Sequence, residues 1–243
     1  MQHKLAAVSK IAVLSLFASC AAPVLAQSAG STVVNVGWAH ITPNDSSTPL
    51  TITQPALGPI PDSGTGVSRT ETLGIAINYF YTDNIVFAAD LGAPPTYKLH
   101  GEGTLAGVGQ IGTAKQWAPT VFVKYFFGEA KAKWRPYVGA GVTYVRYSDV
   151  ELSSRFQQVV GAKFGSPAAV TTAELSRGFS PSINAGVSYQ IDNNWYANLS
   201  LTYVDLKTDA DLTTLATKVG TVKSSTTLTL NPIVAFAAVG YRF

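Results

Sequence analysis

Side chains that could perform acid–base chemistry are scarce in this 243-residue chain, which has three histidines. His100 is the best placed, because Glu102 follows two residues later and the two would share one face of a strand. With Ser63 or Ser68 they could support hydrolysis of a lipid, which needs a histidine beside a serine and a carboxylate. The simpler interpretation is a solvent-exposed histidine at the rim of the fold. We therefore predict no catalytic residues.

Metal, nucleotide and nucleic-acid chemistry are not indicated either. The histidines and carboxylates do not have the spacing of metal ligands. Gly101-Glu102-Gly103 and Gly107-Val108-Gly109 are rich in glycine but lack the lysine and the strand–loop–helix setting of a phosphate loop. Positive and negative residues are scattered along the chain, which is not the pattern of a nucleic-acid-binding protein. We expect no metal, no cofactor and no nucleic-acid partner.

The N-terminus has the features of a signal peptide. Lys4 and Lys10 give it a positive start, residues 11–18 form a short apolar run, and Val24-Leu25-Ala26 ends in the pattern that signal peptidase recognises. A membrane anchor would need about 20 apolar residues. A lipoprotein attached at Cys20 is a further alternative, but the residues before this cysteine match such a site poorly.

Residues 1–26 are therefore the predicted signal peptide, and residues 27–243 are the predicted outer-membrane domain. Only 13% of the whole chain is charged, against about 25% in ordinary soluble domains. Beyond the signal no apolar run approaches the ~18 residues of a membrane-spanning helix. Few charges, many aromatic and glycine residues and no long apolar run indicate a chain that contacts lipid through strands.

Apolar residues alternate with polar or small residues in eight segments, and this period of two predicts strands. In one of them Leu199 and Leu201 lie on one face, and Asn198 and Ser200 lie on the other. The expected strands cover residues 32–38, 73–81, 85–91, 121–127, 138–144, 183–191, 195–203 and 233–243.

The connections between these strands alternate between short and long. This alternation predicts an all-β fold, an eight-stranded antiparallel transmembrane β-barrel with short periplasmic turns and four long extracellular loops. Residues 151–160 and 209–219 contain enough helix-forming residues to predict a short helix in two of the loops. The short turns are at 83–84, 129–133 and 192–194, and the long polar stretches are at 43–66, 101–116, 151–177 and 208–225.

Three features favour a barrel in lipid over a soluble one. The second face of the strands contains Asn, Ser, Thr, Gln, Lys and Gly, which are too polar for a dry core. Aromatic residues gather at the strand ends beside the short turns, where they would form an interfacial girdle. The chain ends on an alternating strand with Tyr241 and Phe243, a signal that resembles the one read by the outer-membrane barrel assembly machinery.

Lipid also requires closure, because every backbone N–H and C=O must be paired internally and only helices and closed barrels achieve this. We therefore expect the chain in the outer membrane of a Gram-negative bacterium. Its expected partners are outer-membrane lipid and the barrel assembly machinery.

Some residues on the inward faces are apolar, and two interpretations stay open for them. The interior of an eight-stranded barrel is just filled by side chains, so they could be core packing. They could instead line an apolar tunnel for a hydrophobic substrate. Asp90, Lys124 and Arg242 would lie among them and should be paired, because unpaired ions are costly there. The apolar residues are Phe80, Phe122, Phe126, Val234 and Phe236.

Several stretches match a known family in their order and spacing. They are Ala118-Pro119-Thr120-Val121, Tyr125-Phe126-Phe127, Arg135-Pro136-Tyr137-Val138-Gly139-Ala140-Gly141, Asn231-Pro232 and Gly240-Tyr241-Arg242-Phe243. Over essentially the whole mature chain they resemble the OmpW family of outer-membrane proteins (OmpW- and AlkL-like proteins).

The resemblance implies passive transport of small hydrophobic molecules and their lateral release into the membrane, through a gap beside a proline of the third strand. Pro94 stands at that place, with Pro95 after it and with Tyr97 where the family often has histidine. We expect these residues and Leu99 to rim the gap. The path to it would be lined by Phe80, Phe122, Phe126 and Phe236.

Two alternatives belong to other functional classes. One is a structural or receptor barrel that binds partners through its loops and transports nothing. The other is a lipid-modifying enzyme that uses His100. We predict a transport barrel for small hydrophobic solutes.

Overall fold

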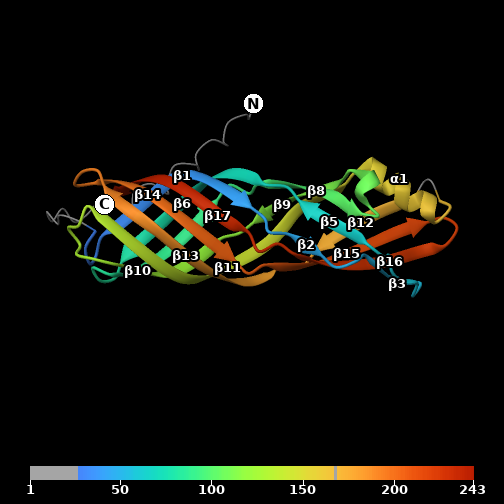
Figure 1. Cartoon of the computed structure of the whole chain (residues 1–243), viewed down its shortest axis with the longest axis horizontal. Helices are drawn as coiled ribbons and strands as arrows, with labels where there is room; N and C mark the ends of the chain where they lie inside the picture. Colours follow the sequence, from blue (N-terminus) through green and yellow to red (C-terminus); the bar gives the residue numbers. More distant parts are fainter. Residues whose placement is uncertain (1–26, 167–168) are drawn as a thin grey trace, which may run out of the picture.

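The computed structural model describes residues 27–166 and 169–243, so the predicted signal peptide lies outside the described residues. The molecule is elongated, with a barrel at one end and a second body of strands at the other (Figure 1). Within the described residues, no helix is long and apolar enough to cross a membrane.

The barrel is a closed ring of eight antiparallel strands. Neighbours follow the order β10-β7-β6-β1-β17-β14-β13-β11, and pairing of β10 with β11 closes the ring. The eight strands and the three short turns predicted from the sequence are confirmed. The barrel strands are β1 (Thr32–Thr42), β6 (Thr70–Phe80), β7 (Ile85–Gly92), β10 (Thr120–Phe126), β11 (Trp134–Leu152), β13 (Gly178–Gln190), β14 (Trp195–Val204) and β17 (Ile233–Arg242).

The four long connections predicted between the barrel strands are present, and they contain strands of their own that form an ordered extension beyond the barrel. The 19-residue β11 leaves the barrel and pairs with β9, which pairs with β8 and then β5. A separate sheet has the order β12-β15-β16-β3-β4. The extension strands are β2 (Ser46–Ser47), β3 (Thr51–Gln54), β4 (Gly58–Pro59), β5 (Ser63–Val67), β8 (Thr96–Gly103), β9 (Gln110–Trp117), β12 (Val170–Leu175), β15 (Lys207–Ala216) and β16 (Gly220–Thr229).

Of the two predicted loop helices, one is confirmed and one is wrong. Helix α1 (Ser154–Lys163) begins at Ser153, whose side chain accepts a hydrogen bond from the backbone N–H of Phe156, a standard N-cap. Residues 209–219 belong instead to the β15–β16 hairpin. Burial alternates along β15, and this period of two outweighs the helix propensity of single residues. The short 3-10 helix η1 (Ala106–Val108) completes the elements.

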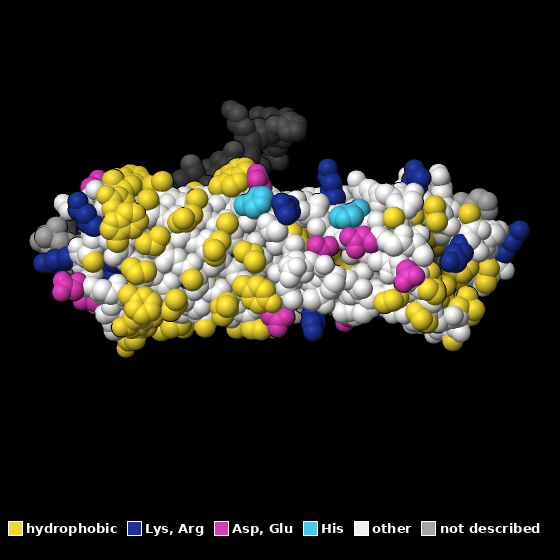
Figure 2. Space-filling model, in the orientation of Figure 1, with side chains coloured by type: hydrophobic (Ala, Val, Ile, Leu, Met, Phe, Trp, Pro, Cys, Tyr) yellow, Lys and Arg dark blue, Asp and Glu magenta, His cyan; other side chains and the backbone are white. Residues whose placement is uncertain are grey.

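The outer surface of the barrel is apolar, as the alternation predicts. Leu199 and Leu201 are more than half exposed, whereas Ser200 between them is 7% exposed. Figure 2 shows hydrophobic side chains spread over the barrel half, whereas charged side chains gather at its short-turn end and appear again, with histidines, from its outer rim onward. Aromatic pairs such as Trp195–Tyr241, Tyr125–Phe127 and Trp134–Tyr189 lie at the short-turn end and form the expected girdle.

Candidate functional site

The main candidate site is a cavity of about 140 Å³ in the lumen of the barrel, on the side of the extension. Its walls are largely apolar and come from strands all round the barrel, including Ile41 of β1, Phe122 of β10, Val204 of β14 and Phe236 of β17. Such a concave, mostly apolar site with few polar groups is the usual form of a small-molecule site. The volume is similar to the ~150 Å³ of an engineered apolar cavity that binds benzene.

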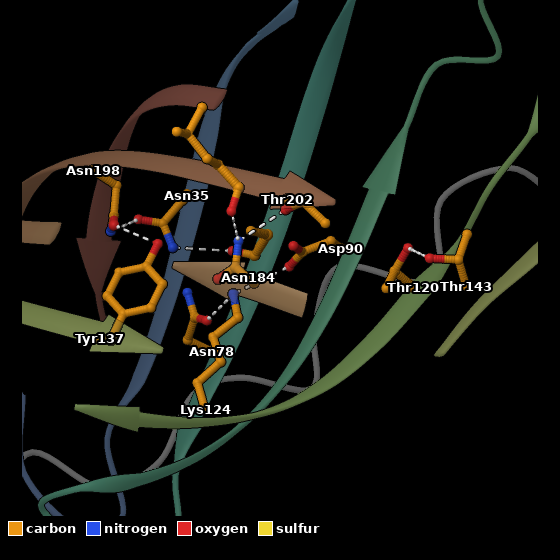
Figure 3. A network of polar contacts seen from close by, with 12 residues as sticks. Asn35, Asn78, Asp90, Thr120, Lys124, Tyr137, Thr143, Asn184, Asn198 and Thr202 are labelled. Atoms are coloured by element: carbon orange, nitrogen blue, oxygen red, sulfur yellow. Dashed lines mark hydrogen bonds and ion pairs between the residues drawn. The ribbon is translucent and has the colours of Figure 1, made fainter. Parts of the chain in front are cut away.

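Polar side chains form the floor of this cavity. Asp90 lines it, and the Asp90 Oδ1 atom lies 3.6 Å from the Nζ atom of Lys124. The same ammonium group donates to Oδ1 of Asn78 at 3.3 Å. Figure 3 shows these three side chains converging from β6, β7 and β10. The prediction that Asp90 and Lys124 are paired in the lumen is confirmed.

Two further groups of polar contacts lie on the inner side of the barrel, and Figure 3 shows the Thr120–Thr143 contact apart from the others. A chain of hydroxyls joins Thr120 to Thr143 at 2.8 Å and Thr143 to Ser182 at 2.7 Å. In the second group, Asn198 Nδ2 donates to Asn35 Oδ1 and Tyr137 Oη donates to Asn198 Oδ1. Asn184 Nδ2 makes a separate contact by donating to Thr202 Oγ1. These contacts satisfy buried polar groups, as a lipid-embedded interior requires.

Below the polar floor, a plug of side chains closes the periplasmic end of the lumen. Phe80 and Phe126 are at most 1% exposed and pack together with Val33, Val86, Tyr137 and Tyr196. Arg135, also 1% exposed, has its guanidinium group 5.7 Å from the ring centre of Phe80 and 5.2 Å from that of Phe126. Its Nη1 donates to the backbone carbonyl of Gln27 at 2.8 Å.

Toward the outside, the main cavity is followed by a series of three further cavities. A cavity of about 30 Å³ shares Tyr97, Gln116, Leu206 and Pro232 with it. The next, of about 60 Å³, shares Leu99, Leu175 and Leu228 with the second. A fourth, of about 150 Å³, shares Leu50, Leu105, Phe156 and Leu212 with the third and reaches α1.

The second cavity is lined by two phenols, Tyr97 and Tyr147, whereas Glu151 and Lys163 are among the lining residues of the third and fourth cavities. Tyr97 is 7% exposed, and burial raises the pKa of its hydroxyl group. Burial also raises the pKa of Tyr147 to about 12, although its hydrogen bond with Thr208 opposes the shift. Both phenols therefore stay neutral at physiological pH.

The pairing of the barrel wall changes at the outer end of β7. Pairing of β7 with β10 ends at Asp90 and Thr120, while pairing with β6 continues to Gly92. Pro94 and Pro95 lie between β7 and β8, and the ladder resumes where Thr96 pairs with Lys115 of β9.

The predicted path residues lie in four places. Phe122, Phe236, Pro95 and Tyr97 line the main cavity, and Leu99 lines two of the outer ones. Phe80 and Phe126 are in the periplasmic plug instead, because the short-turn ends of β6 and β10 place them on the far side of the Lys124 floor. Pro94 precedes Pro95 in the β7–β8 connection. Tyr241 and Phe243 belong to the girdle, where their rings are 5.0 Å apart.

The residues considered for acid–base chemistry do not line the main cavity, although Ser63 is among the lining residues of the third one. The Nε2 atom of His100 is 3.7 Å from Oε1 of Glu102, and both side chains are about half exposed. The hydroxyl of Ser63 donates to the backbone carbonyl of Ile60 and accepts from the N–H of Leu50. His40 contacts Glu71 at 3.0 Å on the outer surface.

Sequence reasoning missed several residues that line the main cavity. Ser200 and Thr202 were predicted as inward-facing polar residues without a role. Gln116 lies in the stretch 101–116 predicted as a loop, and Leu206 lies between the predicted strand 195–203 and the predicted loop 208–225. The inward parity of β14 continues through Ser200, Thr202 and Val204, so the same alternation could have assigned them to the lumen wall.

The model of the OmpW family matches residues 28–243. The chain belongs to the OmpW family. Outer membrane protein W of Vibrio cholerae is 33% identical to it over 234 residues, which cover 96% of this chain and 97% of the relative. Members of the OmpW family are outer-membrane proteins of Gram-negative bacteria, and this chain is an outer-membrane barrel of such a bacterium.

Two further comparisons place this OmpW-family chain among its relatives. The dibenzothiophene metabolism operon protein PahQ of Pseudomonas aeruginosa is 27% identical over 184 residues, 76% of this chain and 77% of the relative. The crystal structure of the outer membrane protein OprG from Pseudomonas aeruginosa superposes with a TM-score of 0.78 at 22% identity, covering 90% of this chain and 98% of OprG. This second likeness confirms the barrel fold.

Proposed function

We propose that this barrel passively transports small hydrophobic molecules across the outer membrane and catalyses no reaction. Molecules enter through the extension, reach the main cavity and leave sideways into the lipid beside Pro94 and Pro95. The observation that carries the proposal is the asymmetry of the lumen. A series of apolar cavities leads inward from the extension, whereas the Lys124 floor and the Phe80–Phe126 plug close the route to the periplasm.

A lateral exit is the route that this asymmetry leaves. The lining of the main cavity includes Ile75 and Leu91, which are cross-strand partners on the lipid face. Gly74 and Gly92 pair beside them and also line the cavity. Because glycine has no side chain, the wall between cavity and lipid is thin here, and backbone can approach a passing molecule closely.

The end of the β7–β10 ladder is in the same part of the wall. Beyond Asp90 the chain continues through Leu91 and Gly92 to two prolines, which have no N–H to donate to a neighbouring strand. A break in pairing is tolerated at membrane depth only where backbone lines a cavity or is covered by protein. A hydrophobic molecule that leaves by this route enters the bilayer without crossing a polar layer.

The relationship to a dibenzothiophene metabolism operon protein also supports the proposal, since dibenzothiophene is a small, flat and apolar molecule. The alternatives, a receptor barrel that binds through its loops and a lipid-modifying enzyme, do not account for this series of apolar cavities.

The test is uptake of dibenzothiophene by cells that lack their own OmpW-family proteins and carry this chain. Ser200→Phe introduces a ring into the cavity, because Ser200 lies opposite Phe236 and lines the lumen. Leu199→Phe is the matched control, since the neighbouring side chain faces lipid. We expect Ser200→Phe to lower uptake to the level of cells without the protein and Leu199→Phe to leave it unchanged. Equal uptake with and without the wild-type protein would contradict the proposal.

A further inference from the structure

We propose that the floor of the main cavity is a binding subsite for one uncharged hydrogen-bond donor, so that the preferred ligands are alcohols and phenols with an otherwise apolar body. This inference rests on the proposed function and names the class of molecule that the cavity selects. The acceptor is the carboxylate of Asp90.

The orientation of Asp90 is fixed by its strand. Asp90 pairs with Thr120 of β10 and with Ala76 of β6, which both face the lumen. The Asp90 side chain is nevertheless 29% exposed. Because it points inward and lines the main cavity, this exposed part faces the cavity and not the lipid.

The two oxygens of the carboxylate have different surroundings. Oδ1 is covered and lies 3.6 Å from the ammonium group of Lys124, with no hydrogen bond to it. Lys124 itself is 3% exposed and is held by Asn78. Its charge therefore stays below the floor, and the remaining exposed part of Asp90, including Oδ2, is available to a ligand as an acceptor.

Several other polar groups of the lining are engaged within the protein. The hydroxyls of Thr120, Thr143 and Ser182 form a chain, and Thr202 accepts from Asn184. A donor that enters the cavity thus has the carboxylate of Asp90 as its accessible charged partner, and hydrogen bonds to charged groups are stronger than those between neutral groups.

The charge of the floor selects against ionic ligands. Asp90 and Lys124 together are neutral, so a cation gains no net attraction and meets the ammonium of Lys124 close behind the carboxylate. An anion would face the carboxylate directly. Either ion would also lose its hydration in a cavity walled by Phe122 and Phe236. A neutral hydroxyl group avoids both penalties and still donates one hydrogen bond.

The size of the cavity fits one ring or a short chain at the floor. Its volume of about 140 Å³ is close to that of a cavity that accepts benzene. A longer body would continue past Tyr97 and Leu206 into the second cavity. The hydroxyl group then lies at the floor, and the apolar body extends toward the outside.

The experiment compares four ligands of similar size on the full mature barrel in lipid nanodiscs. They are p-cresol as the neutral donor, p-xylene without a donor, benzylamine as a cation and benzoate as an anion. Binding is read from NMR shifts of the backbone amides of Thr120 and Gly92, beside the floor, with Leu199 on the lipid face reporting simple partition into the bilayer. We expect p-cresol to bind roughly tenfold more tightly than p-xylene, and both ions to bind more weakly than p-cresol.

Variants of the ion pair should change the order of the ligands in opposite directions. Asp90→Asn leaves the ammonium of Lys124 alone and should favour benzoate, whereas Lys124→Met leaves the carboxylate alone and should favour benzylamine. The double variant Asp90→Val with Lys124→Met removes both charges and should abolish the advantage of p-cresol over p-xylene. If a single variant fails to fold, the order of ligand affinities of the wild type and of the double variant still tests whether Asp90 is the acceptor.

The outcomes separate this inference from the proposed function. If p-xylene and p-cresol shift the cavity amides with equal affinity, the cavity binds apolar molecules but the donor subsite is refuted. If the double variant keeps the preference for p-cresol, Asp90 is not the acceptor. If none of the four ligands shifts Thr120 or Gly92 beyond the change at Leu199, the proposed function fails together with the subsite.

Discussion

Arg135 shows how a single charged residue can stabilise an apolar plug. Its side chain is buried between Phe80 and Phe126, and it donates to the backbone carbonyls of Gln27 and Asp83. The carbonyl of Gln27 belongs to the segment before β1, and the carbonyl of Asp83 belongs to the β6–β7 turn. The guanidinium group therefore joins these two chain segments to the start of β11.

Replacing Arg135 by Met keeps the buried stem and removes the donors. The two carbonyls would lose their charged partner, so we expect the free energy of unfolding to fall by about 2 kcal/mol. Reversible unfolding in lipid vesicles measures this difference. Arg135→Lys restores one donor and should recover part of the loss, whereas a Met variant as stable as the wild type would show that the carbonyls do not need Arg135.

Asp192 gives the β13–β14 turn a defined pH dependence. Its Oδ1 accepts from the backbone N–H groups of Asn194 and Trp195, both at 2.8 Å, and these bonds hold its pKa below the usual value. A carboxyl group with a lowered folded pKa stabilises the fold above its unfolded pKa, about 3.9, and this stabilisation is lost as pH falls through the folded value.

We therefore expect Asp192→Ala to lower the free energy of unfolding at pH 7. As the pH falls below about 4, the variant should lose less stability than the wild type loses. Unfolding curves of both proteins between pH 7 and pH 3 provide the measurement. Asp192→Asn is the control, because an amide oxygen still accepts both bonds but does not titrate. Parallel curves for the Ala variant and the wild type would exclude this role.

At the scale of elements, the connection from β7 to β8 joins a barrel strand to the extension. The chain passes through Ala93, Pro94 and Pro95, and the backbone carbonyl of Pro95 accepts from the N–H of Gln116 at 3.1 Å. Neither proline can donate to a neighbouring strand, so this short segment lacks two backbone donors, although the N–H of Ala93 still donates to the carbonyl of Leu73.

Substituting Pro94 and Pro95 together by Val should extend the ladder and narrow the lateral opening. We expect uptake of dibenzothiophene to fall while the stability of the barrel holds or rises. Pro119→Val is a suitable control, because Pro119 lies between β9 and β10 and its replacement leaves the β7–β8 connection intact. Unchanged uptake by a well-folded double variant would mean that the prolines only terminate β7. The lateral route would then have no support from them.

At the scale of the whole molecule, the C-terminus closes the barrel and carries the predicted assembly signal. The N–H of Phe243 donates to the backbone carbonyl of Thr32 at 2.9 Å, which joins the last residue to the first strand. Its ring packs on Tyr241, which packs on Trp195, and the Phe243 side chain is 70% exposed.

Phe243→Ser should lower the amount of folded, heat-modifiable barrel in membranes more than it lowers the stability of barrel that has already formed. The exposed ring contributes little packing, whereas the assembly machinery would read it directly. Phe127→Ser is the matched control, as Phe127 is a half-exposed girdle residue away from the C-terminus. Equal yields for both variants in cells would contradict the assembly role.

The sequence by itself determined the barrel. The period of two in segments such as 195–203 fixes which side chains face lipid, because a slip of one residue would turn the whole apolar face inward. The same parity placed Asp90 and Lys124 in the lumen, where the cost of an unpaired ion requires the contact found between them. Local alternation was sufficient for these conclusions because every barrel strand must present an apolar face to lipid.

Only the tertiary structure decided the extension, the plug and the cavity. The stretches at 43–66 and 208–225 are polar and lack the strong alternation of the barrel, yet β3 and β16 pair across more than 160 residues of chain. Phe80, Phe122 and Phe126 share the inward parity, but their heights in the lumen assign Phe122 to the cavity and the other two to the plug. Height and long-range pairing depend on strand tilt and register around the closed ring, which no local pattern in the sequence specifies.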